Sequence, residues 1–298
     1  MSEPAFLLFA GKGGVGKTTL AAATALAFAE RGHRTLLIST DPAHSAGDAL
    51  ESSLGADPTQ IVDNLWAVEL DPDAEAARYV DGVRRHVADI TPPGMTGEVD
   101  RQLAMARETP GVVEAAILER LAVLTEGLGS GWDRIVVDTA PFGHTLRLLA
   151  MPDTMRVWLD AVIGRRRKLG ALEQMWRTVR GDAPDTDRIL AVLEARRERL
   201  RRLRSLLTDP ARAAVTLVAI PERLSLLETR RSAETLRGSG IRPAALVVNR
   251  VAVEDGEHVA AFRAAFPELH LTELPLAPRT VRDRALLHYI GARLEGSP

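Results

Sequence analysis

A glycine-rich loop near the start of the chain is the feature that most constrains its fold. Residues 11–19 read GKGGVGKTT, which matches the phosphate-loop pattern of glycine, four spacers, glycine, lysine and a hydroxyl residue. A continuous apolar segment at 5–10 precedes the loop, and an alanine-rich segment at 19–30, free of glycine and proline, follows it. Strand, glycine loop and helix in this order are the context that the motif requires. The sequence therefore predicts an α/β fold with a phosphate site.

Each residue type in the loop has a physical reason. Glycines permit positive φ, which turns backbone N–H groups inward toward phosphate oxygens at the start of the next helix. We expect Lys17 to place a charge at the β- and γ-phosphates and the Thr18 hydroxyl to ligate Mg²⁺. The other loop residues expected to contact the nucleotide are Gly13, Gly14, Val15, Gly16 and Thr19.

Lysine is scarce in this chain, and its distribution supports the same interpretation. Lys12, Lys17 and Lys168 are the only lysines, and two of them lie in the nine-residue loop. Arginine carries the rest of the positive charge. The use of lysine in this loop therefore indicates a site that needs a compact ammonium rather than a planar guanidinium. The alternative is a glycine-rich turn that contains a lysine by chance.

Two aspartates follow predicted strands that belong near this loop. Asp41 comes directly after a buried strand at 34–40, and Asp138 ends a second strand that begins near Trp132. Parallel strands joined by crossover helices bring their carboxyl ends to one edge of the sheet. Asp138 then has the Walker B position, which holds Mg²⁺ directly or through water. The alternatives are a helix N-cap for Asp41 and a turn-initiating role for Asp138.

The rest of the chain predicts a mostly parallel sheet flanked by helices on both faces. The amide of Asn249, at the end of a predicted strand, can donate and accept at once, as an adenine edge requires. We expect one P-loop NTPase domain over 1–298, with an added helical subdomain inserted at about 71–130 and 152–210. Further strands are expected at 65–70, 215–220, 244–248 and 271–274, and helices at 44–50, 73–89, 112–128, 142–149, 226–237 and 281–294.

The second insertion combines a leucine stripe with many arginines. We expect a packed apolar face and a solvated charged face, with a basic docking surface as the alternative. The stripe consists of Ile189, Leu193, Leu200, Leu203 and Leu207. The arginines are Arg196, Arg197, Arg199, Arg201, Arg202 and Arg204.

Composition narrows the classes of function. A net charge of −2 argues against a nucleic-acid partner, and no apolar run approaches the roughly 18 residues of a spanning helix. The chain enters a strand without a signal-like segment, so a cytoplasmic protein is expected. The chain has no cysteine, which excludes thiolate zinc sites, and no zinc is expected.

Several motifs together resemble the ArsA-type anion-transporting ATPases and the related guided-entry ATPases, which deliver tail-anchored membrane proteins. These proteins have a deviant Walker A loop, and the resemblance spans nearly the whole chain. The matching segments are GKGGVGKTT at 11–19, STDPAH at 39–44, DTAPFGHTLRLL at 138–149, Pro221-Glu222 with Glu228-Thr229, VVNR at 247–250 and the proline-leucine segment that begins at Pro275.

The resemblance implies an ATPase that uses ATP and Mg²⁺ and switches between open and closed forms of a nucleotide-sandwich dimer. It implies that Lys12 reaches the phosphates of the partner subunit and that Asp41 orients the attacking water. Asn249 would recognise adenine, and Pro275 would contact the nucleotide. The dimer would be a homodimer or a heterodimer with a paralogous subunit. Its client would be a partner protein, a membrane protein or a tail-anchored segment, with any membrane contact made through that partner.

The sequence departs from both groups, and other functions compete. The zinc clasp of guided-entry ATPases and the metalloid site of arsenite pumps use cysteines, which this chain lacks. Arsenite pumps are tandem repeats, and no repeat is seen here. The first alternative is a partitioning or positioning ATPase of the ParA and MinD kind, acting as an assembly factor. The second is a small-molecule kinase or ligase, although no acceptor site is evident.

Overall fold

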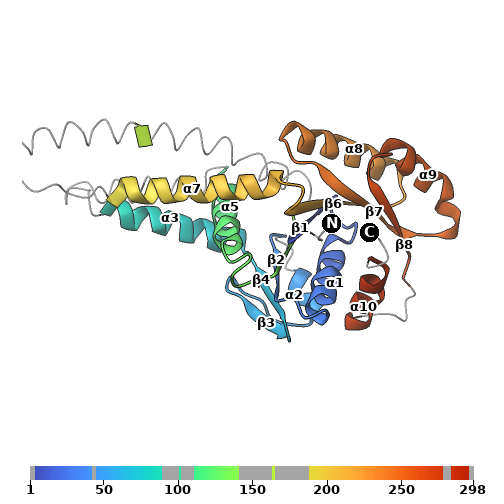
Figure 1. The fold of residues 1–298 in the computed structure, drawn as a ribbon, viewed down its shortest axis with the longest axis horizontal. Coiled ribbons are helices and arrows are strands. Elements are labelled where there is room, and N and C mark those ends of the chain that lie inside the picture. The colour runs from blue at the N-terminus through green and yellow to red at the C-terminus, as the bar shows by residue number, and fades with distance from the viewer. Residues whose placement is uncertain are drawn as a thin grey trace, which may run out of the picture.

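A computed structural model describes residues 4–41, 45–88, 101, 111–140, 163–164, 188–277 and 283–294. Within these residues the chain forms an eight-stranded sheet with the order β3-β4-β2-β5-β1-β6-β7-β8 (Figure 1). Strand β3 pairs antiparallel with β4, and the other described pairings are parallel. The strands are β1 (Phe6–Gly11), β2 (Thr35–Ser39), β3 (Thr59–Val62), β4 (Leu65–Glu69), β5 (Arg134–Asp138), β6 (Ala213–Ala219), β7 (Pro243–Val251) and β8 (His270–Pro275).

Helices cover both faces of the sheet, as the sequence predicts. Successive residues of β1 alternate between two apolar clusters, with Leu8 in one and Phe9 in the other, because strand side chains point to opposite faces. Helices α1 and α10 pack against the face of Phe9, and α5, α7, α8 and α9 supply the other cluster. The helices are α1 (Lys17–Glu30), α2 (Ser45–Leu50), α3 (Pro72–Ala88), α5 (Val112–Thr125), α7 (Arg188–Thr208), α8 (Arg223–Gly238), α9 (Gly256–Ala265) and α10 (Asp283–Leu294), with a 3₁₀ turn, η1 (Val253–Asp255).

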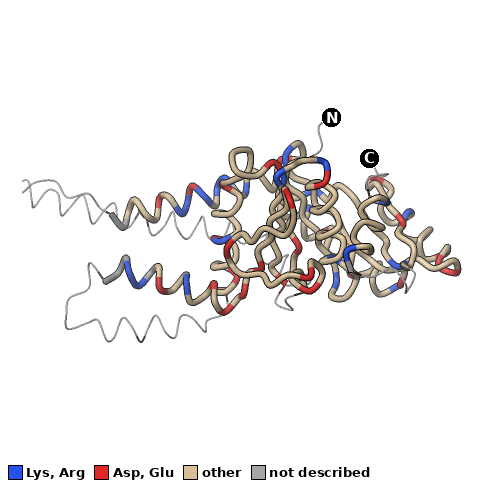
Figure 2. Tube along the Cα trace, turned by 90° about the horizontal axis from the view of Figure 1, so that it is seen from below, with Lys and Arg blue, Asp and Glu red and all other residues tan. Residues whose placement is uncertain are grey.

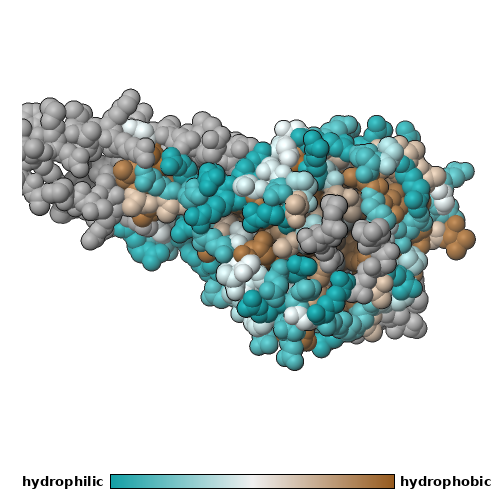
Figure 3. Space-filling view, viewed as in Figure 1, coloured by the Kyte–Doolittle hydropathy of each residue, from teal (hydrophilic) through white to brown (hydrophobic). Residues whose placement is uncertain are grey.

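Helices α3 and α7 project from the sheet in the same direction, and α5 packs against both (Figure 1). Leu200, Leu203 and Leu207 of α7 are buried, and Leu193 is half buried against the same cluster, which confirms the predicted apolar face for these residues. The side chain of Ile189 and the segment 165–187 lie outside the described residues. Basic and acidic residues both occur along α3 and α7 (Figure 2). Hydrophilic residues cover most of the described surface that faces the viewer in Figure 3.

The arginines of α7 correct the simple picture of a solvated face. Arg196 Nε lies 2.9 Å from Glu119 Oε1 of α5, and its guanidinium carbon lies 4.7 Å from the ring centre of Tyr79 in α3. Arg199 pairs with Glu126 at 3.5 Å. Part of the basic face therefore joins helices rather than facing water alone.

Among the described elements, β3, the 3₁₀ turn η1 and α9 are not predicted by the sequence, and β7 runs past its predicted end at residue 248. Strand β3 is short and half exposed at the edge of the sheet, so it lacks a hydrophobic alternation. Helix α9 buries only Val259 and Phe262 among its ten residues, which leaves a weak apolar pattern. Strand β7 runs on to Val251, so Asn249 lies within the strand rather than after it.

The helix predicted just after Asp138, through residue 149, lies outside the described residues, as do His44 and His144. No helix in the described part of the chain is long and apolar enough to cross a membrane.

Candidate functional site

The glycine loop connects β1 to α1 at the carboxyl edge of the sheet. Gly14 has φ 78° and Gly16 has φ 98°, a backbone region that favours glycine. A Cβ at Gly11 would lie 2.5 Å from Val218 O, so that position also needs glycine. Helix α1 begins at Lys17 without a described side chain capping its N-terminus. Its first N–H groups are therefore available to an anion.

Lys17 is buried at the base of this loop. Its Nζ donates a hydrogen bond to Lys12 O at 3.2 Å, and the residue is only 4% exposed. Burial lowers the pKa of Lys17, and the charges of Asp138 and Asp41 oppose that shift. The structure thus brings one ammonium and two carboxylates from three separate segments within electrostatic reach of each other.

Asp138 is fully buried at the end of β5. Ser39 Oγ donates to its Oδ2 at 3.3 Å, whereas Oδ1 has no hydrogen-bond partner among the described residues. Burial is the main cause that raises the pKa of Asp138 to about 6; the nearby Thr18 hydroxyl, Lys17 and Ser39 lower it, and Asp41 raises it further. The Thr18 hydroxyl also lies 3.0 Å from Ser45 Oγ.

The donor set around Asp138 fits Mg²⁺. A buried carboxylate oxygen without a partner is costly unless a cation or donor meets it. Mg²⁺ prefers oxygen ligands and keeps several waters, so one carboxylate and the nearby Thr18 hydroxyl suffice on the protein side. Within the described ranges, no group of three or more His, Asp or Glu side chains forms a self-sufficient metal cage.

Asp41 follows β2 and is half buried. Its backbone N–H donates to Ser39 Oγ at 3.4 Å, and its charge acts on both Lys17 and Asp138. Sequence reasoning included Ser39 in a motif but gave it no role, and the structure places it directly beside Asp138 in the pairing of β2 with β5. Sequence reasoning missed Glu69, whose Oε1 accepts the N–H of Ala46 at 3.1 Å near the start of α2. A hydroxyl at the last position of one strand beside an acidic strand end is the signal that would have found Ser39.

Lys12 does not point into the same buried cluster. Its Nζ lies 3.4 Å from Glu228 Oε2 of α8, with 39% of the Lys12 side chain and 34% of the Glu228 side chain exposed. Sequence reasoning noted Glu228 as part of a motif but assigned it no contact. The second lysine of the loop is therefore held at the surface by an ion pair within its own chain.

Asn249 and Pro275 reach the same edge from β7 and β8. Asn249 Nδ2 donates to Val15 O of the loop at 2.8 Å. Pro275 pairs with Val251 and is exposed, and the following N–H, that of Leu276, donates to Val251 O at 3.0 Å. The structure places both residues near the carboxyl ends of neighbouring strands, and their contacts with a nucleotide stay predictions.

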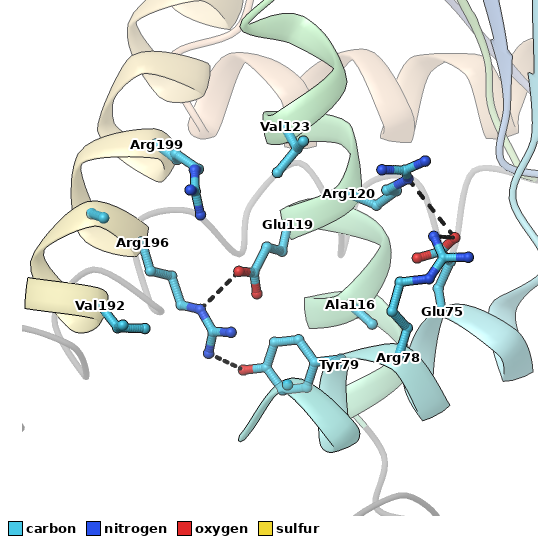
Figure 4. A pocket seen from close by; sticks show the side chains of 12 residues that line it. Glu75, Arg78, Tyr79, Ala116, Glu119, Arg120, Val123, Val192, Arg196 and Arg199 are labelled. Carbon is cyan, nitrogen blue, oxygen red and sulfur yellow. Dashed lines mark hydrogen bonds and ion pairs between the residues drawn. The ribbon is translucent and has the colours of Figure 1, made fainter. Parts of the chain in front are cut away.

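A cavity of about 350 Å³ lies away from the loop, between α3, α5 and α7 (Figure 4). Its arginines are paired with carboxylates: Arg78 lies 3.0 Å from Glu75, and Arg196 lies 2.9 Å from Glu119 and donates to Tyr79 Oη at 3.3 Å. Arg196 of α7 therefore joins α5 through an ion pair and α3 through a hydrogen bond, and Arg78 pairs within α3. The cavity thus does not offer a set of unpaired charges to a ligand.

We expect Asp138→Asn to make the stability of the protein less dependent on pH. The pKa of Asp138 is raised in the folded state, so its contribution is fully present below pH 3.8 and is lost as pH rises through about 6. A shift of this size costs about 3 kcal/mol at neutral pH. Thermal unfolding without metal should show the wild type losing stability relative to Asp138→Asn between pH 4 and pH 7.

Added Mg²⁺ provides the control for this prediction. It should restore stability to the wild type at pH 7 and leave the asparagine variant unchanged, because only the carboxylate gains from a cation. Parallel stability profiles of the two proteins from pH 4 to pH 7 would contradict the role of burial at this position.

The strand-loop-helix geometry and the parallel sheet define a protein of the P-loop NTPase fold. The family model described as anion-transporting ATPase matches residues 5–293. The chain therefore belongs to the anion-transporting ATPase family.

Known relatives agree with this assignment. A Chlorobaculum tepidum relative is 36% identical over 252 residues, which cover 82% of this chain and 60% of that protein. An arsenical pump-driving ATPase from Acidiphilium multivorum is 34% identical over 86% of this chain and 41% of its own length. One from Escherichia coli is 32% identical over 94% of this chain and 45% of its own length. The chain thus spans 60% or less of these relatives.

Proposed function

We propose that this chain is a Mg²⁺-dependent ATPase whose hydrolysis switches a nucleotide-sandwich dimer. One observation carries the proposal: Lys17, Asp41 and Asp138 converge from different segments on a glycine loop, and no described side chain caps the helix that follows it. An anion with a divalent cation is the partner that such an arrangement of charges favours. Family membership supports ATP as that anion.

The residues have distinct proposed roles. The loop from Gly13 to Thr19 binds the phosphates, and Lys17 places its ammonium at the β- and γ-phosphates. Asp138 and the Thr18 hydroxyl would hold Mg²⁺, which would supply positive charge next to the phosphate oxygens. Asp41 orients the attacking water. This role needs no raised pKa, because phosphoryl transfer to water depends chiefly on positioning and charge stabilisation.

The surface around Lys12 supports the dimer. Leu224 of α8 lies one turn before Glu228, the partner of Lys12, and Leu224 and Leu227 are 55% and 41% exposed. An exposed apolar patch beside a lysine of the phosphate loop fits a surface that a second subunit covers when nucleotide is bound. The partner subunit is a second copy or a paralogue, and the Lys12 ammonium of each subunit would reach the phosphates of the other.

The helices α3, α5 and α7 are the part of the chain that we assign to contact with a partner. We propose that they belong to a helical subdomain within a single ATPase domain and transmit opening and closing to a membrane-protein or tail-anchored client. A ParA- or MinD-like positioning ATPase stays the alternative. The two differ in partner, so co-purification from the native cell separates them.

The proposed activity is tested directly by hydrolysis of ATP by the purified chain, with Mg²⁺ and with a chelator. We expect slow basal turnover that the chelator removes. Absence of both turnover and ATP binding, with the fold shown intact by circular dichroism, would overturn the proposed function.

The apolar patch of α8 yields a further prediction. In the presence of a non-hydrolysable ATP analogue, Leu224→Asp should weaken the affinity of self-association by about tenfold or more, because the variant buries a charge at the interface. An aspartate near the start of α8 does not weaken the helix. Analytical ultracentrifugation with and without the analogue measures the effect.

Arg230→Asp is the control, because it also introduces an aspartate at an exposed position of α8, but about 120° around the helix from Leu224. It should retain association driven by the ATP analogue. An equal loss in both variants would argue against a specific interface at Leu224.

A further inference from the structure

We propose that Asn249 is a positioning residue that fixes the shape of the phosphate loop and couples that shape to recognition of the base. The part of this inference that concerns the base rests on the proposed function. The part that concerns the loop, called the loop half below, rests on the structure alone. Asn249 Nδ2 donates to Val15 O at 2.8 Å, a contact that joins β7 to a loop 234 positions earlier in the chain.

The contact determines where one backbone N–H of the loop points. In a planar trans peptide, the carbonyl of Val15 and the N–H of Gly16 point in opposite directions. A side chain that holds Val15 O on one side therefore holds the Gly16 N–H on the other. Gly14 and Gly16, on either side of Val15, have φ values of 78° and 98°. Successive N–H groups in such a turn form a concave anion site only while these peptide planes keep their orientation.

The packing around the contact leaves little freedom. The Val15 side chain is fully buried in the apolar cluster beneath α1, so its carbonyl is the end of the residue that Asn249 holds. A Cβ added to Gly16 would lie 2.5 Å from Asn249 Nδ2, which means that the amide rests against the glycine backbone. The amide and the glycine therefore fit each other.

The amide is itself held by its own strand. Its Oδ1 accepts the N–H of Arg250 at 2.9 Å, and Arg250 has φ 60°, where the pairing of β7 with β8 shifts register. These two bonds use one of the two Nδ2 protons and one of the two Oδ1 lone pairs. One donor and one acceptor remain on a half-buried side chain, and adenine presents the complementary pair. A single amide can thus hold the loop and bind the base.

Tripolyphosphate separates the two roles because it has phosphates and no base. With Mg²⁺ present, calorimetry on the full chain should show Asn249→Ala weakening tripolyphosphate about fivefold to tenfold, the loss expected from one hydrogen bond. The affinity for ATP should fall by more than the affinity for tripolyphosphate, since the contact with the base is lost as well. A variant that weakens ATP and leaves tripolyphosphate unchanged would overturn the loop half of the proposal.

A second variant and a second measurement keep the test independent of nucleotide. Asn249→Asp keeps the volume and the acceptor for Arg250 N–H but turns an oxygen toward Val15 O. Hydrogen exchange of the free protein should then speed up in the first turn of α1, where the Leu20 N–H donates to Gly16 O at 3.0 Å. We expect this in both variants, by about tenfold in Asn249→Asp. Unchanged exchange there would overturn the proposal even if the chain binds no nucleotide.

Arg250→Ala is the control, because its backbone N–H and positive φ persist while only an exposed side chain is removed. It should match the wild type in loop exchange and in tripolyphosphate affinity. Failure of the wild type to bind ATP would refute the proposed function but leave the exchange test of the loop contact standing.

Discussion

Lys17→Ala is expected to reduce Mg²⁺-dependent ATP hydrolysis by at least about a hundredfold, the loss typical when a preplaced charge at the transition state is removed. The physical reason is burial. The ammonium is 4% exposed and has a lowered pKa, so it has given up hydration to lie beside the loop. Water entering the truncated site cannot replace a fixed cation at the γ-phosphate. Steady-state phosphate release measures the effect.

The same variant should fold normally. Removing a buried ammonium also removes its desolvation cost, so thermal stability without nucleotide should be equal to or above that of the wild type. Lys17→Arg retains the charge in a wider, planar group and should also be strongly impaired. Retention of more than a tenth of wild-type turnover by Lys17→Ala would contradict the proposed role of this lysine.

Lys12→Ala is expected to separate nucleotide binding from turnover. The Lys12 side chain is 39% exposed and pairs with Glu228 across the surface, so its removal should leave most ATP affinity intact. If Lys12 acts on the phosphates of the second subunit, the variant should lose association driven by an ATP analogue. Its turnover should fall by about a hundredfold. Binding, sedimentation and phosphate release measured on one preparation distinguish these effects.

Glu228→Gln is the matched control, because it removes the same ion pair from the other side. A half-exposed pair of this kind contributes about 1 kcal/mol or less to stability. With Glu228 neutral, Lys12 is released from its contact within the chain, so association in the ATP analogue should be equal to or stronger than in the wild type. Equal losses in Lys12→Ala and Glu228→Gln would mean that the ion pair is purely structural. A strict monomer with ADP and with the ATP analogue would remove the role of Lys12 in a second subunit.

The glycine loop and the strands around it were predictable because their signals are local. A run of apolar residues buries a strand on both faces, and glycines permit the positive φ that Gly14 and Gly16 adopt in the loop. Once parallel strands are expected, their carboxyl ends must share one edge, and this brings Asp41 near Asp138. The proximity of Lys17, Asp41 and Asp138 therefore follows from the sequence pattern and simple topology.

The tertiary structure alone decided the contacts between distant segments. Ser39 meets Asp138 through strand register, Lys12 meets Glu228 through the packing of α8, and Asn249 reaches Val15 because β7 continues past its apolar run. The sequence by itself determined the phosphate loop, the parallel sheet and the residue types at its edge. It left open which side chains hold that loop, because a polar side chain has no periodicity that reveals its partner, and only the packed fold sets the distance between them.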